Sequence, residues 1–462
     1  MRPSGSRTLD PDAPSAAAAA SSSGSGSGSP IGTPPGKELL ECGFSYPQTE
    51  GATEGPGIDG DANDGRTMKE LALDEKENFT PYDNEELTTK DIEERPIAQV
   101  SLSPGNEVTL TPQPPGGQRH IRSEQQPALR KKDFQKMPKW DFEDVYTSND
   151  HSRQTACPLS LRTSEDANFT ESFLPNINLF MYNSSVNMSE WNRLSHFNNP
   201  FGFMEYDYKD VKGAVENIPK PQQPLLVSRG GGCVTCAVVG MAGILNGSGM
   251  GQEIDRHDYV FRMNGAVTQG YEDDVGNKTS IYLHTAHSLT AALIYNKKHG
   301  FKRIPQDEGI KYVMIPEGIR DLQWLQALFT GKLVAAGPYK NLRPSQYYSG
   351  DLNNQFYLLH PDFMRYVRNR FLKSPGLDYD FWPVVRPSNG ALALFLALHT
   401  CDVVNAYGFI TEDYHKYPYN YCEGHGQRKM NFYLTHDFVT EMKAWKKLHN
   451  AGIIKLYQRM DN

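Results

Sequence analysis

The sequence predicts an α/β domain with a mainly parallel central sheet, preceded by a disordered stem. Short apolar runs typical of strands alternate with amphipathic helical patterns along residues 151–462, which is the order of a parallel sheet covered by helices. Residues 1–150 are instead low-complexity or acidic and polar, with too few apolar side chains to form a core. A length of 462 residues leaves room for one large domain beside such a stem.

Six apolar runs predict the strands of the sheet. They are CAVVG (236–240), TSIYLH (279–284), KYVMIP (311–316), QFYLLH (355–360), DVVNAYGF (402–409) and IIKLY (453–457). The charged segment that ends at Ala266, after the first of these runs, is predicted to be helical.

Three segments between the strands have helical periodicity. The segment 321–329 places Leu322, Leu325 and Phe329 on one face. The segment 360–373 has Pro361 near its start and one apolar stripe, with its arginines expected on the opposite face; the stripe consists of Met364, Val367 and Phe371. The segment 441–452 turns Met442, Trp445 and Leu448 inward, and Gly452 is expected to end it.

Charge and hydropathy exclude several classes of protein. The formal net charge of −8 disfavours a nucleic-acid partner. No run reaches the roughly 18–20 apolar residues of a membrane span, and ALALFLALH (391–399) is instead predicted to be a buried helix. A basic region followed by an apolar core is also not seen at the start of the sequence, so it gives no indication of a signal peptide.

The six cysteines fit two or three disulfides, or ordinary buried thiols. A zinc finger needs a second ligand pair, and none follows Cys236 for about 165 residues. A thioredoxin-like site needs its Cys-x-x-Cys at the start of a helix, whereas Cys236 leads into a predicted strand. Sequons for N-glycosylation favour a secretory route, although unused sequons in a cytosolic protein are the alternative; they occur at Asn78, Asn168, Asn183, Asn187, Asn246 and Asn277.

Two turns between strand or loop and helix are candidate phosphate sites. Gly240 and Gly243 follow a strand, where small residues let backbone N–H groups approach a ligand, but they also fit a purely structural turn. No Gly-Lys-Ser/Thr follows, so this is not a Walker loop, and Ala242 breaks the dinucleotide fingerprint. In the second turn, Ser388 or Asn389 can cap a helix that begins near Gly390, and this helix start either binds an anion or is only a structural N-cap.

One histidine, in the segment THDFVTE, is a candidate general base. His436 suits this role because imidazole titrates near neutrality, while an inert histidine at a helix start is the alternative. Glu441 is not expected to orient this ring, because five helical residues place the two side chains about 140° apart.

Three segments together resemble the motifs of animal sialyltransferases. Residues 236–280 resemble the large sialylmotif, residues 386–409 the small one and residues 436–441 the very small one. The resemblance spans roughly residues 155–458. Cys-Val-Thr-Cys, GFITE and KLHNAGIIKLYQR are most similar to the branch that sialylates O-6 of N-acetylgalactosamine (GalNAc) on mucin-type O-glycans.

The resemblance implies a Rossmann-like catalytic domain of the GT-A-variant type that uses CMP-sialic acid. It implies inversion at the anomeric carbon, neither metal nor cofactor, and glycoprotein acceptors that carry GalNAc on Ser or Thr. Family members are type II membrane proteins of the Golgi; the signal anchor that they have is not visible in this sequence.

Site residues follow from the resemblance position by position. His436 would be the base. Disulfides would join Cys236 to Cys401 and Cys157 to Cys233. The donor would contact Gly240, Met241, Gly243, Asn264, Thr285, Ser388, Asn389, Gly390, Asn420 and Tyr421.

The sequence departs from the family pattern at two of these positions. Met241 stands where this branch usually has Asn, and Asn420 stands where the family has a histidine that contacts the leaving phosphate. His415 or His425 is the candidate replacement for that histidine. A weak or inactive member that binds the donor or a glycan without efficient turnover is therefore the alternative function. A nicotinamide enzyme is a further alternative, with Asp255 or Asp258 as the ribose ligand.

Overall fold

The computed structural model describes residues 125, 128–134, 142–149, 155–227, 232–423 and 435–459. Most of the predicted stem, with the Asn78 sequon, lies outside the described residues, and the stem boundary at residue 150 stays a prediction. Within these ranges, no helix has both the length and the apolar character needed to cross a bilayer.

Eight strands form one sheet in the described part of the chain, in the order β1-β6-β5-β4-β3-β2-β7-β8. All neighbouring pairs are parallel except the edge pair β1–β6, which is antiparallel. The predicted α/β fold with a mainly parallel sheet is therefore confirmed. The strands are β1 (Phe180–Met181), β2 (Thr235–Val239), β3 (Tyr259–Met263), β4 (Ile281–His284), β5 (Lys311–Met314), β6 (Phe356–Leu359), β7 (Val403–Tyr407) and β8 (Lys455–Leu456).

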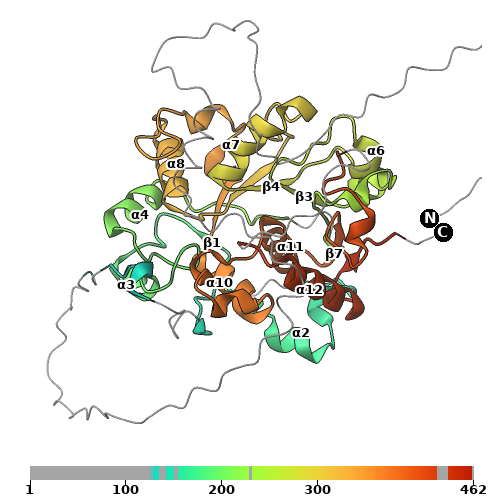
Figure 1. Cartoon of the computed structure of the whole chain (residues 1–462), viewed down its shortest axis with the longest axis horizontal. Coiled ribbons are helices and arrows are strands. Elements are labelled where there is room, and N and C mark those ends of the chain that lie inside the picture. Colours follow the sequence, from blue (N-terminus) through green and yellow to red (C-terminus); the bar gives the residue numbers. More distant parts are fainter. Residues whose placement is uncertain are drawn as a thin grey trace, which may run out of the picture. The chain divides into compact units, whose positions relative to one another are not determined.

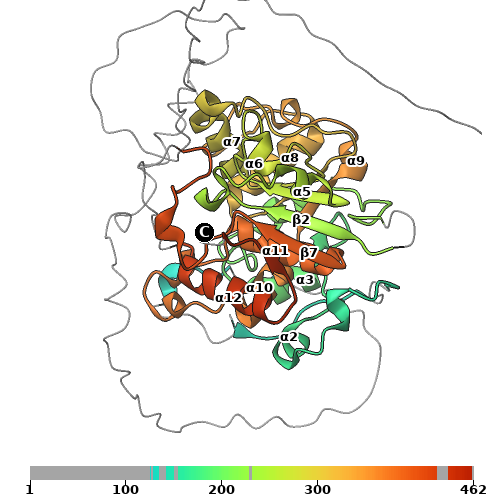
Figure 2. The same ribbon diagram turned by 90° about the vertical axis from the view of Figure 1, so that its right-hand side faces the viewer.

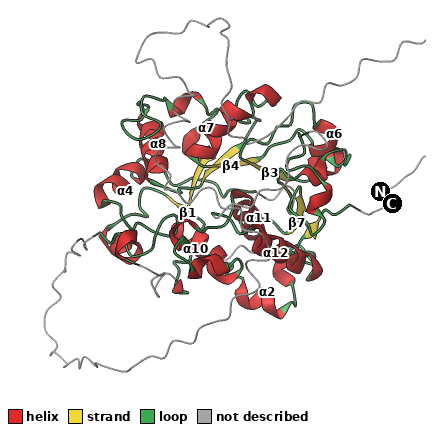
Figure 3. Ribbon diagram, viewed as in Figure 1, coloured by secondary structure: helices red, strands yellow, loops and turns green. Residues whose placement is uncertain are grey.

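Helices cover both faces of this sheet. Figures 1 and 2 place α10, α11 and α12 on one side of the strands, and α7 and α8 on the other. Figure 3 shows the strands as a central layer between helices. The helices are α2 (Ala167–Ser172), α3 (Met188–Leu194), α4 (Tyr208–Val215), α5 (Gly251–Asp255), α6 (Glu272–Val275), α7 (Ala286–Tyr295), α8 (Ile319–Thr330), α9 (Leu352–Gln355), α10 (Pro361–Arg370), α11 (Asn389–Thr400) and α12 (Phe438–Asn450).

The six predicted strands correspond to β2, β4, β5, β6, β7 and β8, and the three predicted helices to α8, α10 and α12. The helical prediction for the charged segment before Ala266 is wrong over half of its length. Only α5 is helical, and the segment then forms β3. The cause is Arg262, a fully buried strand residue whose guanidinium donates to the backbone oxygens of Val275 and Lys278.

The arginines of α10 also correct a prediction. Arg365 and Arg368 were expected on the solvent side, but both are buried. The guanidinium of Arg365 lies 3.9 Å from the ring centre of Phe197, and that of Arg368 lies 4.0 Å from Phe201. Planar guanidinium groups stack on aromatic rings, so these cations pack under the residues that precede α4.

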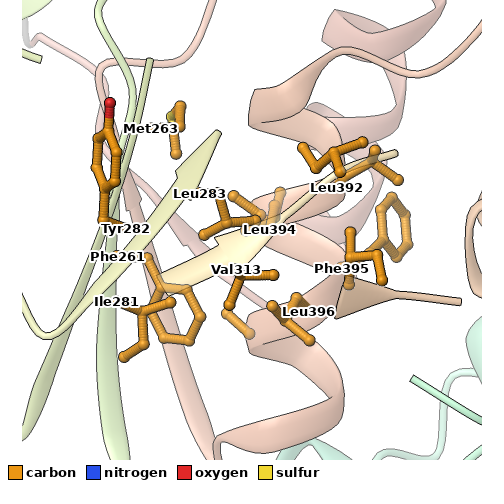
Figure 4. Packing of buried hydrophobic residues seen from close by; sticks show 14 of the residues in the cluster. Phe261, Met263, Ile281, Tyr282, Leu283, Val313, Leu392, Leu394, Phe395 and Leu396 are labelled. Atoms are coloured by element: carbon orange, nitrogen blue, oxygen red, sulfur yellow. The ribbon is translucent and has the colours of Figure 1, made fainter. Parts of the chain in front are cut away.

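The core covers both faces of the sheet, and on one face it lies against α11. Residues 391–400 of this helix are all buried, which confirms the predicted buried helix. Figure 4 shows side chains of α11, such as Leu394 and Leu396, beside Phe261, Leu283 and Val313 of the sheet. Burial on every side explains why this stretch is apolar all round rather than amphipathic.

Both predicted disulfides are present. Cys236 of β2 is bonded to Cys401, just after α11, and Cys157 is bonded to Cys233. The Cys-x-x-Cys is thus two half-cystines with different partners, which excludes the redox and zinc interpretations of this motif.

Candidate active site

The predicted site residues converge at the carboxyl edge of the sheet. Val239 pairs with Arg262, so the chain leaves β2 at Gly240 and β3 at Asn264 side by side. Helix α11 leads into β7, which is parallel to these strands, and its N-terminus therefore reaches the same edge. Ligands of open α/β sheets bind at this edge.

Asn264 and Asn389 join β3 to α11. The side-chain amide of Asn389 donates to Oδ1 of Asn264 at 2.6 Å. Asn264 has a positive φ of 54°, and its backbone bonds with Leu283 and Tyr282 hold it there. Oδ1 of Asn389 is buried and accepts no hydrogen bond from the described residues. A buried acceptor of this kind normally has a partner, and a bound ligand would supply one.

Ser388 caps α11 and also ties it to α12. Its Oγ accepts from the N–H of Ala391, while its own N–H and hydroxyl donate to the two carboxylate oxygens of Glu441 at 2.7 and 2.8 Å. Burial raises the pKa of Glu441 to about 7. The Ser388 side chain is therefore occupied by protein contacts, and Gly390, where an added Cβ would meet no atom closer than 3.5 Å, leaves the start of α11 open.

His436 lies just before α12 with its ring half-buried. Nδ1 is 3.0 Å from the backbone oxygen of Arg386. A carbonyl can only accept, so Nδ1 carries the proton and the lone pair of Nε2 is free for another proton. Burial and then the positive charge of Arg386 lower the pKa of His436 to about 4, so the imidazole is neutral near pH 7.

Arg386 is held on two sides. Its guanidinium bonds both carboxylate oxygens of Glu317, at 3.0 and 3.2 Å, and its N–H donates to the oxygen of Thr435. Burial alone would raise the pKa of Glu317, but the charge and hydrogen bonds of Arg386 lower it to about 2. The ion pair thereby fixes the peptide whose oxygen selects the tautomer of His436.

The glycine turn after β2 is shaped by close packing. A Cβ at Gly240 would clash with the oxygen of Gly408, and one at Gly243 with the oxygen of Pro418. Packing alone thus requires glycine at both positions. Met241, which is half-buried, accepts from the N–H of Tyr421 through its backbone oxygen.

The remaining predicted donor contacts are buried. Thr285 caps α7 in a reciprocal pair with Ser288, and the hydroxyl of Tyr421 donates to the oxygen of Val267. The amide of Asn420 lies 3.4 Å from Oε1 of Glu423. His415 is exposed on a short 3₁₀ turn, and His425 lies outside the described residues. No group of three or more potential metal ligands occurs in the described ranges.

Two contacts at this edge were not predicted: the Glu317–Arg386 ion pair and the Glu441–Ser388 clamp. The sequence holds one usable signal, since Glu317 follows a strand and precedes a helix at the ligand-binding edge. The prediction that Glu441 does not orient His436 agrees with the structure, where the carboxylate binds Ser388 instead.

The family model of glycosyltransferase family 29 (sialyltransferase) matches residues 180–453, and the chain belongs to this family. Alpha-N-acetylgalactosaminide alpha-2,6-sialyltransferase 1 of Gallus gallus is 43% identical over 394 residues, which cover 82% of this chain and 69% of the relative. The enzyme of the same name from Homo sapiens is 46% identical, over 72% of this chain and 57% of its own length. Alpha-N-acetylgalactosaminide alpha-2,6-sialyltransferase 2 of Mus musculus is 41% identical, over 68% of this chain and 85% of its own length.

A solved structure described as "Crystal Structure of a Mammalian Sialyltransferase" is also similar to this chain. It shares 25% identity, covers 67% of this chain and all of its own, and superposes with a TM-score of 0.49.

Proposed function

We propose that the protein transfers sialic acid from CMP-sialic acid to O-6 of GalNAc on mucin-type O-glycans, forming an α-2,6 linkage with inversion. The names of the relatives at 41–46% identity support this donor group and acceptor. The observation that carries the chemistry is the neutral imidazole of His436, with Nε2 unprotonated, close to the N-terminus of α11.

In the proposed step, Nε2 of His436 takes the proton from the acceptor hydroxyl at O-6. The oxygen forms its bond to the anomeric carbon as the bond from that carbon to the phosphate oxygen breaks, and CMP leaves with the electron pair. The reaction gains from a positioned base and from N–H donors that stabilise the growing charge on phosphate.

The donor in this proposal lies along the carboxyl edge of β2, β3 and β4. Asn264, Asn389 and the open backbone at Gly390 are the groups best placed to contact it. The other predicted donor contacts remain proposals: the side chains of Thr285, Ser388, Asn420 and Tyr421 bond within the protein, and the two glycines can offer only backbone atoms. These other contacts are Gly240, Met241, Gly243, Thr285, Ser388, Asn420 and Tyr421.

We place the protein in the Golgi lumen. Two disulfides require an oxidising compartment, and four sequons lie on exposed residues. Glycoproteins with GalNAc on Ser or Thr are the proposed acceptors, and the membrane anchor remains an expectation from the family.

Transfer from labelled CMP-sialic acid to a GalNAc-bearing peptide tests this function. We expect label in the peptide, released by a sialidase. A folded, disulfide-bonded protein that incorporates none would contradict the proposal.

The alternative is a member that binds the donor without efficient turnover. Asn420 favours it, since this residue is buried and cannot carry a charge to the leaving phosphate. Calorimetry with CMP separates the two: binding without transfer supports the alternative, and no binding contradicts both.

A further inference from the structure

The segment between α10 and α11 has both of its ends attached beside His436. At one end, the hydroxyl of Ser374 donates to Oδ2 of Asp437 at 2.7 Å. At the other end, the oxygen of Arg386 accepts from Nδ1 of His436 at 3.0 Å. Residues 374–386 therefore start and finish at the candidate base, and the residues between lie at the edge of the site.

Buried side chains hold this segment against the domain. Leu377, Trp382 and Val385 are all buried, and the amide of Asn198 donates to the oxygen of Pro383 at 3.1 Å. The segment thus follows a fixed course rather than lying loosely on the surface.

Two apolar side chains of this segment are exposed, beside the exposed carboxylates of Asp378 and Asp380. Tyr379 is 49% exposed and Val384 is 39% exposed. The rings of Tyr379 and Phe381 stack with centres 5.5 Å apart and planes only 5° from parallel. Seven large apolar residues are exposed in the described part of the chain, and two of them belong to this one segment. Clustered apolar exposure on an anchored segment is typical of a binding surface.

We propose that Tyr379, Phe381 and Val384 form an acceptor surface for the peptide that carries GalNAc, a segment rich in Pro, Ser and Thr. This inference rests on the proposed function, because it requires the reacting sugar to sit at His436. Both ends of the segment lie beside His436, so a peptide joined to the reacting sugar would meet the residues between them.

The chemistry of the surface fits such a peptide. Sequences with dense O-glycans are rich in Ser, Thr and Pro. Pro-rich segments are extended before they bind and dock on surfaces lined by aromatic rings, because little conformational entropy is then lost. Two parallel stacked rings offer one flat apolar face to a proline ring.

The test compares two acceptors: a GalNAc-peptide with flanking prolines, and the methyl α-glycoside of GalNAc. We expect Tyr379→Ser to raise KM for the glycopeptide about fivefold, and to leave kcat/KM for the methyl glycoside within about twofold. Loss of one aromatic contact of about 1 kcal/mol gives a change of this size. Tyr379→Phe, which keeps the ring, should behave like the wild type.

Leu159→Ser is the matched control, because Leu159 is 75% exposed outside this segment. This substitution should leave KM for the glycopeptide and kcat/KM for the methyl glycoside unchanged. An unchanged KM of Tyr379→Ser for the glycopeptide would overturn the proposal. An equal loss of kcat/KM for both acceptors would also overturn it, because the ring of Tyr379 would then contact the sugar rather than the peptide.

A wild-type chain that transfers to neither acceptor would contradict the proposed function instead. Calorimetry with the glycopeptide then tests the surface directly, and equal affinities of the wild type and Tyr379→Ser would reject it.

Discussion

His436 has its proton position fixed by a backbone oxygen, and its pKa is lowered first by burial and then adjusted by two neighbours of opposite charge. The carbonyl of Arg386 selects the tautomer, the guanidinium of the same residue lowers the pKa of the ring, and the carboxylate of Glu317 raises it. Activity that depends on the neutral ring should be lost as the pH falls through this pKa.

Charge substitutions at this pair should therefore move the acidic limb of the kcat/KM profile in opposite directions. Arg386→Gln removes the cation that disfavours the protonated ring, so the pKa of His436 rises and the limb moves to higher pH. Glu317→Gln removes the anion that favours it, so the limb moves to lower pH. Initial rates with the GalNAc-peptide across pH 4 to 8 measure both shifts.

Arg320→Gln serves as the control, because Arg320 lies 3.8 Å from the same carboxylate. This substitution should leave the limb in place. Shifts of the same sign in Arg386→Gln and Glu317→Gln would mean that the pair acts only on packing.

At the scale of elements, the start of α11 is built by residues from three other parts of the chain. Asn264 meets it from β3, Glu441 from α12, and the Glu317–Arg386 pair connects the residues just before it to the start of α8. The two helix starts that carry Ser388 and His436 are joined at three points, so the proposed base and the proposed phosphate site keep a fixed separation.

The clamp between α11 and α12 should make stability depend on pH. The pKa of Glu441 is about 7 in the folded protein, above the ordinary value of 4.5, so its contribution is fully present below pH 4.5 and is lost as the pH rises through 7. Glu441→Gln removes the buried charge. The free energy of unfolding of the variant relative to wild type should therefore increase from pH 5 to pH 8 by on the order of 3 kcal/mol, and its melting temperature should rise relative to wild type over the same range.

Thermal unfolding of both proteins at several pH values checks this effect. Glu412→Gln is a suitable control, since Glu412 is an exposed carboxylate that pairs with Lys446. A constant difference between Glu441→Gln and wild type at every pH would show that Glu441 is not buried as a charge.

For the whole molecule, much of the fold could be predicted from local patterns. Apolar runs located six strands, and the cap at Ser388 located α11. Arg262 and Arg365 could not be assigned, because their burial depends on carbonyls and rings contributed by other segments. The contacts that build the site could not be predicted either. Glu317 and Arg386 are 69 residues apart, and periodicity does not say which strand ends meet.

The fold also separates the sequons into two groups. Asn168, Asn183, Asn187 and Asn277 are exposed, whereas the amide nitrogen of Asn246 donates to the oxygen of Tyr421 at 2.6 Å. N-glycosylation replaces one of the two N–H groups on this nitrogen, so a glycan at Asn246 would have to fit beside Tyr421, next to the proposed donor site. Peptide mapping of the protein purified from a glycosylating host should find Asn246 unmodified, and full occupancy there in an active protein would contradict the described packing.

The most direct test of the central claim is single-turnover transfer by His436→Ala, measured together with CMP affinity. Removal of a general base should slow transfer by about 10²–10⁴-fold, while CMP binding stays within about twofold of wild type. Transfer within about tenfold of wild type, or equal loss of transfer and CMP binding, would contradict the assignment of His436 as the base.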